Sequence, residues 1–140
     1  MNVLAIDIAK EAVEIMKKNG VKRVHCRDIF NMSHWSFDTM ILLGHGIGMT
    51  GTIEGFRRFL AHARTIISPE GQILFDSLDV RCTTDEANLA YQENNRKNNI
   101  YIGEIRLHFE YKGETGQPWN WLQIDPETLE AETAAAGWSC

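Results

Sequence analysis

The sequence predicts an α/β protein with a mostly parallel sheet of about four core strands, flanked by helices, and a late antiparallel β-hairpin. Two observations lead to this class. Short apolar segments and amphipathic segments follow one another in the order strand, helix, strand, strand, helix, strand, which is typical of parallel strands joined by right-handed crossovers. Residues 104–111 then alternate between apolar and polar side chains, which is typical of a half-buried antiparallel strand.

The parallel strands are expected in the first part of the chain. They are residues 3–7, 21–27, 37–43 and 72–77. Helices are expected at residues 9–19 and 52–67, because apolar side chains recur there at helical spacing. Gly44–Gly51 is expected to be a glycine-rich loop, and residues 68–71 a turn, since proline fixes φ and glycine permits the reversal.

The second part of the chain has a different character. Residues 83–99 are polar and asparagine-rich, and they are expected to be helical or mobile in part. Residues 104–111 and 119–124 are the expected strands of the hairpin. A last helix is expected at residues 125–136, with proline at its first position and Gly137 after its end.

Composition narrows the classes of function. The formal net charge of −5 argues against a sequence-independent nucleic-acid binder, because no basic stripe balances phosphate charge. No apolar run approaches the roughly 20 residues of a membrane span. Cys26, Cys82 and Cys140 are far apart, and the histidines show no ligand spacing, so we expect no metal site and no disulfide framework. Reduced thiols favour a cytoplasmic protein.

Four segments carry a resemblance to a known family. They are VLAIDI (residues 3–8), DIF (28–30), FDTMILL (37–43) and ISPEGQIL (67–74). With these segments the chain resembles the class I S-adenosylmethionine-dependent methyltransferases over nearly its whole length. The resemblance implies a three-layer Rossmann-like fold, S-adenosylmethionine as cofactor and a small-molecule methyl acceptor.

The resemblance also implies roles for particular residues. In that family, the acid that matches Asp7 holds the ribose hydroxyls, the residues that match Asp28 and Ile29 contact adenine, and the loop after the third strand lies beside the methionine part. The implied cofactor site consists of Asp7, Ile8, Asp28, Ile29, Gly44, His45 and Gly46. Trp119 and Trp121 resemble the insertion that covers the substrate pocket.

Each of these residues also has a structural interpretation. Asp7 can cap the helix at residues 9–19, and Asp28 can cap a turn. His45 follows the carboxyl end of a parallel strand, where α/β sheets bind ligands, so it is a candidate base or a simple loop residue. Trp119 and Trp121 share one face of a strand and can serve core packing or substrate stacking.

The sequence departs from the family pattern at both ends. Nothing that matches the first strand and its Gly-x-Gly-x-Gly loop precedes residue 3, and nothing that matches the last two strands follows Trp138. In a sheet of order 3-2-1-4-5, the first strand is central. We therefore expect one incomplete domain over residues 1–140, with weak or no cofactor binding and activity by the polypeptide alone. Its expected parts are an α/β core (1–80), an insertion with the hairpin (81–124) and a C-terminal helix (125–140).

Two other functions stay open. The chain can be a non-catalytic α/β fragment that assembles with a partner or as a homodimer through exposed strand edges. It can also be an NAD-type nucleotide-binding βαβ unit, because Gly46, Gly48 and Gly51 satisfy the dinucleotide fingerprint after a strand, and Asp76 ends the next strand. Against this unit, the distance from Gly51 to Asp76 exceeds the roughly 20 residues expected between loop and acid.

Overall fold

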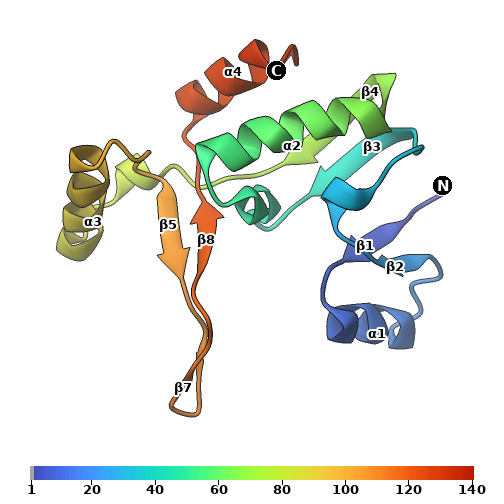
Figure 1. The fold of residues 1–140 in the computed structure, drawn as a ribbon, viewed down its shortest axis with the longest axis horizontal. Helices are drawn as coiled ribbons and strands as arrows, with labels where there is room; N and C mark the ends of the chain where they lie inside the picture. Colours follow the sequence, from blue (N-terminus) through green and yellow to red (C-terminus); the bar gives the residue numbers. More distant parts are fainter. Residues whose placement is uncertain (1) are drawn as a thin grey trace.

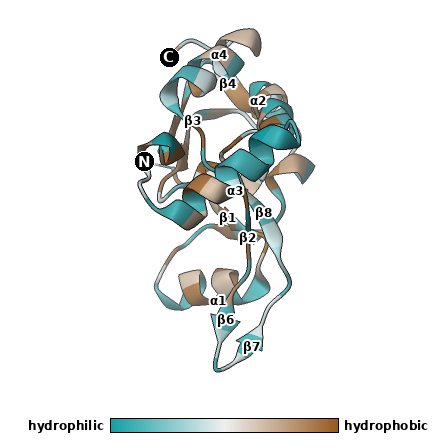
Figure 2. Ribbon diagram, turned by 90° about the vertical axis from the view of Figure 1, so that its left-hand side faces the viewer, coloured by the Kyte–Doolittle hydropathy of each residue, from teal (hydrophilic) through white to brown (hydrophobic). Residues whose placement is uncertain are grey.

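Four short parallel strands form two separate pairs. β1 (Ala5–Asp7) pairs with β2 (Val24–Cys26), and β3 (Phe37–Leu42) pairs with β4 (Ile67–Phe75). The computed structural model describes residues 2–140, and among them no strand joins the two pairs into one sheet. Both views show the order β4, β3, β1, β2 down the picture, so β1 and β3 are the inner strands (Figures 1 and 2). Each inner strand therefore has one unpaired edge.

The core lies between β3–β4 and α2 (Ile53–Ile66). The helix begins where the Thr52 hydroxyl accepts a hydrogen bond from the Gly55 amide at 2.9 Å. Its apolar stripe is fully buried and consists of Phe56, Phe59, Leu60, Ala63 and Ile66. These side chains meet Met40, Leu42, Ile73 and Phe75 from one face of the strand pair. Burial of this stripe is the main stabilisation of the fold.

The opposite face of β3–β4 is exposed. Ile41 and Leu74 are register partners on that face, and Leu43 follows β3. Their exposed fractions are 62%, 46% and 69%. A group of large aliphatic side chains on one exposed face is unusual on a protein surface. Such a patch marks a surface that another apolar surface can cover.

Residues 68–71 do not reverse the chain, so the predicted turn is wrong. β4 begins at Ile67, directly after α2, and runs to Phe75. Phe37 pairs with Ile67, but Thr39 pairs with Gln72, so the intervening residues form a bulge within the strand. The proline and glycine that indicated a turn are compatible with a bulge as well.

The insertion is a helix followed by a long hairpin, as the sequence predicts. Residues 83–99 contain α3 (Glu86–Lys97), whose buried side chains are the polar Gln92 and Asn95. Figure 2 shows much of this helix in hydrophilic teal. The remaining elements here are η3 (Val80–Cys82), β5 (Glu104–Leu107), β6 (Glu110–Tyr111), β7 (Glu114–Thr115) and β8 (Trp119–Leu122). β5 pairs with β8 and β6 with β7, both antiparallel, which confirms the hairpin.

Two further helices complete the chain. α1 (Lys10–Lys18) packs on β1 and β2 and buries Val13. α4 (Pro126–Ala135) begins at the cap residue Asp125, with proline in its first turn as predicted. Arg57 of α2 holds Glu132 of α4 in a two-pronged ion pair, with both nitrogen–oxygen distances at 2.7 Å. The α/β class with parallel core strands and a late antiparallel hairpin is thus confirmed.

Candidate functional site

The predicted cofactor residues lie at the carboxyl ends of the parallel strands. Asp7 is the last residue of β1, and Asp28 follows β2 at the start of η1 (Ile29–Asn31). His45 follows β3, and Asp76 directly follows β4. The carboxyl ends of parallel strands are where α/β proteins bind their ligands. The register within each pair therefore brings together Asp7 with Asp28, and His45 with Asp76.

Asp7 and Asp28 each use one carboxylate oxygen to cap local structure. Asp7 Oδ1 accepts from the Ala9 amide at 2.7 Å, ahead of α1, and Asp28 Oδ1 accepts from the Phe30 amide at 2.9 Å. The second oxygen of each side chain makes no hydrogen bond to any residue in 2–140. A ribose hydroxyl or an adenine amino group donates hydrogen bonds, so these two oxygens fit the adenosine part of the implied cofactor. Capping and ligand binding are compatible here.

The two isoleucines of the implied site lie in different surroundings. Ile8 is 76% exposed, next to Asp7. Ile29 is buried and belongs to the core, and its carbonyl oxygen lies 2.8 Å from His62 Nε2. The side chain of Ile8 is therefore open to a ligand, whereas that of Ile29 contributes to packing.

Gly44, His45 and Gly46 form a tight turn after β3. Gly44 and His45 have positive φ values of 69° and 60°, and Gly46 opens the 3₁₀ helix η2 (Gly46–Thr50). A non-glycine residue at positive φ is uncommon and is found preferentially at functional turns. The His45 amide donates to Asp76 Oδ2 at 3.0 Å, and His45 Nδ1 lies 3.4 Å from the same oxygen.

The two tryptophans of β8 have different neighbours. The Trp121 ring lies directly on Gly48 of η2, where an added Cβ would come within 2.0 Å of the ring. Trp119 packs against Phe109 at a tilt of 39°, with 4.6 Å between the ring centroids. Trp121 therefore covers the turn that carries His45, while Trp119 lies further out along the hairpin. Of the predicted pair, only Trp121 packs against the predicted cofactor loop.

The dinucleotide fingerprint has a packing role in this structure. Gly48 lies under Trp121, and a Cβ on Gly51 would meet Asn120 at 3.2 Å. The first amide of α2, that of Ile53, donates to Glu104 Oε1 at 2.9 Å. In a dinucleotide-binding unit, the pyrophosphate lies at this helix N-terminus. A carboxylate of the chain itself occupies that position, which disfavours the NAD alternative.

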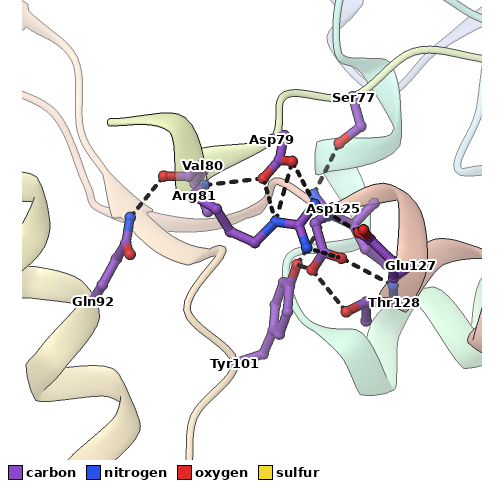
Figure 3. Close-up of polar contacts among 10 residues, drawn as sticks. Ser77, Asp79, Val80, Arg81, Gln92, Tyr101, Asp125, Glu127 and Thr128 are labelled. Carbon is purple, nitrogen blue, oxygen red and sulfur yellow. Dashed lines mark hydrogen bonds and ion pairs between the residues drawn. The ribbon is translucent and has the colours of Figure 1, made fainter. Parts of the chain in front are cut away.

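A buried polar network ties the insertion to α4 (Figure 3). Asp125 is 4% exposed and accepts from the Tyr101 hydroxyl at 2.5 Å and from the Thr128 hydroxyl at 2.7 Å. Arg81 of η3 lies 3.4 Å from Asp125 and also pairs with Asp79 and Glu127. Sequence reasoning missed this cluster, because its members are far apart in the chain.

The network shifts the pKa values of several of its members, among them Asp125 and Tyr101. Burial alone would raise the pKa of Asp125, but hydrogen bonds from Tyr101 and Thr128 outweigh it and hold that pKa below its ordinary value. Burial, together with the hydrogen bond to Asp125, raises the pKa of Tyr101 to about 12. Every buried polar side-chain atom of this cluster has a partner within residues 2–140, so we interpret the cluster as structural.

Among residues 2–140, no group of three or more histidine, cysteine, aspartate or glutamate side chains is arranged to hold a metal ion. None of the helices in this part of the chain has the length and apolar character that a membrane span requires.

Comparisons with known proteins place this site in context. No protein-family model matches the chain, and none of the curated proteins matches it. Among solved structures, the chain is similar to an S-adenosylmethionine-dependent methyltransferase from Bacteroides fragilis, crystallised with S-adenosyl-L-homocysteine. Sequence identity is 34% and the TM-score is 0.77, over 97% of this chain and 54% of that one. The chain thus spans about half the length of that protein.

Two more distant structures have the same fold. One is an S-adenosylmethionine-dependent methyltransferase from Clostridium acetobutylicum, with 13% identity and a TM-score of 0.55 over 97% of this chain and 63% of that one. The other is a sugar N-methyltransferase from Streptoalloteichus, with 15% identity and a TM-score of 0.59 over 94% and 61%. At these identities the likeness concerns the fold.

Proposed function

We propose that this chain, which has the fold of the class I S-adenosylmethionine-dependent methyltransferases, carries the adenosine-binding side of a methyltransferase site that acts on a small molecule. The observation behind the proposal is the placement of Asp7 and Asp28 at neighbouring strand ends, each with one carboxylate oxygen uncommitted. When bound, S-adenosylmethionine supplies a methyl group on positively charged sulfur.

The residues have distinct roles in this proposal. Asp7 accepts hydrogen bonds from the ribose, Asp28 accepts from the adenine amino group, and exposed Ile8 packs on the adenosine. The turn of Gly44, His45 and Gly46 faces the methionine part, where its positive φ values allow the backbone to come close. The unpaired inner edges of β1 and β3 support weak cofactor binding by the chain alone. The adenosine side of the site lies on β1–β2 and the turn with His45 follows β3, and within residues 2–140 no sheet joins these two strand pairs.

The acceptor side of the site is the hairpin. Trp121 covers η2 beside His45, and its ring can form one wall of a pocket for a small acceptor. The net charge of −5 supports an acceptor other than nucleic acid. Cys26, Cys82 and Cys140 are free thiols with exposed surfaces, which supports a reducing compartment such as the cytoplasm as the place of action.

Saturation-transfer NMR with S-adenosylhomocysteine tests the proposal, because the method detects weak binding. We expect the adenosine protons of the ligand to receive the most saturation. Asp7→Asn should reduce this signal, since an asparagine oxygen can still accept from the Ala9 amide but the charge that binds the ribose is lost. Asp38→Asn is the matched control, because Asp38 lies at the opposite end of its strand.

Two outcomes would contradict the proposal. One is the absence of any saturation transfer to S-adenosylhomocysteine at millimolar ligand. The other is a signal that Asp7→Asn and Asp38→Asn reduce equally. Transfer to NAD, with none to S-adenosylhomocysteine, would revive the dinucleotide alternative in spite of Glu104.

A second candidate function is self-assembly, and we propose a homodimer as its form. The unpaired edges of β1 and β3 offer backbone hydrogen-bonding groups, and Ile41, Leu43 and Leu74 form an exposed aliphatic face beside them. A second copy would cover this face. Size-exclusion chromatography with light scattering should show a dimer that Ile41→Glu dissociates. Leu89→Glu, a change of equal chemistry on exposed α3, should leave the mass unchanged. A strict monomer at high concentration would end this candidate.

A further inference from the structure

His45 and Asp76 come together because two parallel strands end in register. Leu42 of β3 pairs with Phe75 of β4, so the residues that follow each strand lie beside one another. Asp76 is held first by the backbone, since its Oδ2 accepts from the His45 amide at 3.0 Å. The imidazole Nδ1 lies 3.4 Å from the same oxygen. The carboxylate is therefore fixed against one edge of the ring.

The contact between the two side chains is incomplete. His45 Nδ1 and Asp76 Oδ1 are both buried, and neither makes a hydrogen bond within residues 2–140. The His45 side chain as a whole is nevertheless 45% exposed, and that of Asp76 is 43% exposed. The solvent-facing part of His45 is thus on the side of the ring away from Nδ1. Buried polar atoms without partners are costly and are found preferentially where function requires them.

The backbone around His45 is held by η2 and by the hairpin. The His45 carbonyl accepts from the Gly48 amide at 2.9 Å, and the Trp121 ring lies on that same glycine. Asp76 is the one charged side chain within ion-pairing distance of the ring among the described residues.

We propose that Asp76 is a positioning residue that holds His45 in the Nδ1–H tautomer, so that Nε2 acts as the general base for the methyl acceptor. The inference rests on the function proposed above. Nε2 takes the proton from the acceptor heteroatom, and that atom forms the new bond to the methyl carbon. The bond between carbon and sulfur breaks with its electron pair on sulfur, leaving S-adenosylhomocysteine. Asp76 stabilises the imidazolium that results.

The tautomer can be measured without knowledge of the acceptor. Long-range ¹⁵N–¹H correlation spectra at mildly alkaline pH should show a proton on Nδ1 of His45 and an unprotonated Nε2. Asp76→Ala should remove this preference, because the Nδ1 proton then has no carboxylate to bind. Asp79→Ala is a matched control, since Asp79 pairs with Arg81 and not with His45.

The chemical reactivity of His45 gives a second measurement. A purely structural role of Asp76 would not change this reactivity. Diethyl pyrocarbonate acylates an unprotonated imidazole nitrogen, and mass spectrometry assigns the modified residue. We expect His45 to react severalfold faster than exposed His34 and His108, and to lose this advantage in Asp76→Ala. The Asp79→Ala control should keep the fast reaction of His45, because Asp79 pairs with Arg81 and not with the imidazole.

The outcomes separate the two proposals. A proton on Nε2 of His45 in the unmodified protein, or a tautomer unchanged in Asp76→Ala, overturns the inference whether or not S-adenosylhomocysteine binds. The expected tautomer without any binding of S-adenosylhomocysteine overturns the methyltransferase function, and the base role with it. The expected tautomer, its loss in Asp76→Ala and saturation transfer to S-adenosylhomocysteine by the unmodified protein together support both.

Discussion

Gly48 shows how one residue can fix the position of a whole hairpin. The Trp121 ring lies so close that an added Cβ would come within 2.0 Å of it. In the sequence, this glycine is part of an apparent nucleotide fingerprint. Its physical role is to let an aromatic ring approach the backbone, which the fingerprint alone does not distinguish from ligand binding.

Gly48→Ala should destabilise the protein by about 1 to 3 kcal/mol, because a methyl group forced into a filled space displaces the Trp121 ring. Urea unfolding, followed by tryptophan fluorescence, measures the change. Gly116→Ala, in the hairpin that carries Trp121, is the matched control, since its Cβ would be in ordinary contact at 3.5 Å or more. Equal stability of the two variants would contradict this prediction, because it would show that the Trp121 ring can move away from residue 48 without cost.

Asp125 predicts a dependence of stability on pH. Its pKa is held below the ordinary value of 3.8, so the ionised carboxylate stabilises the fold above that pH. This contribution is lost as the pH falls through 3.8 toward the lowered pKa. We expect Asp125→Asn to reduce the free energy of unfolding at about pH 7 and to have a smaller effect near about pH 3. A pH-independent difference in urea unfolding would contradict the role of the charge.

Residues at strand ends were more predictable than the pairs that they form. The positions of Asp7 and Asp28 follow from local apolar patterns, because a strand that ends in an acid is visible in the sequence. The pairing of His45 with Asp76 depends on the register of β3 with β4, which is set by packing on α2. For that reason, the sequence alone indicates Asp76 only as a possible ribose partner in the NAD alternative.

Among the elements, the bulge in β4 and the start of α2 were the hardest to predict. The proline and glycine of residues 68–71 indicate a turn, and only the pairing with β3 shows that the strand continues. The α2 N-terminus is capped locally by Thr52 and at long range by Glu104 of β5. No local pattern links Glu104 to Ile53, which is 51 positions away.

Glu104→Ala should destabilise α2 by about 1 kcal/mol, because an acceptor and a negative charge are removed from a helix N-terminus. Glu104→Gln should cost less, since its amide oxygen can still accept from the Ile53 amide. Thermal unfolding followed by circular dichroism compares them, with Glu114→Ala on exposed β7 as the control. A Glu104→Ala variant as stable as the control would mean that water accepts the hydrogen bond of the Ile53 amide equally well.

In the molecule as a whole, stability is unevenly distributed. The fully buried side chains come from α2, from Met32 after η1, from Ile47 of η2 and from the base of the hairpin, whereas residues 2–28 bury only Val13 and Val24. The class of the fold was predictable because local periodicity determines which segments are strands and helices. The division into two strand pairs was not, since it depends on which edges meet in three dimensions.

The sparse packing of residues 2–28 has a consequence for deuterium uptake. A segment with few buried side chains opens locally at a lower free-energy cost than the core, so the amides of α1 should exchange well before those of α2. Asp7 and Asp28 both belong to this loosely anchored segment. A nucleoside that binds both carboxylates would bind only the closed form of this segment and would therefore stabilise it against local opening. Slower amide exchange in α1 would then show that the nucleoside is bound, although α1 itself does not contact it.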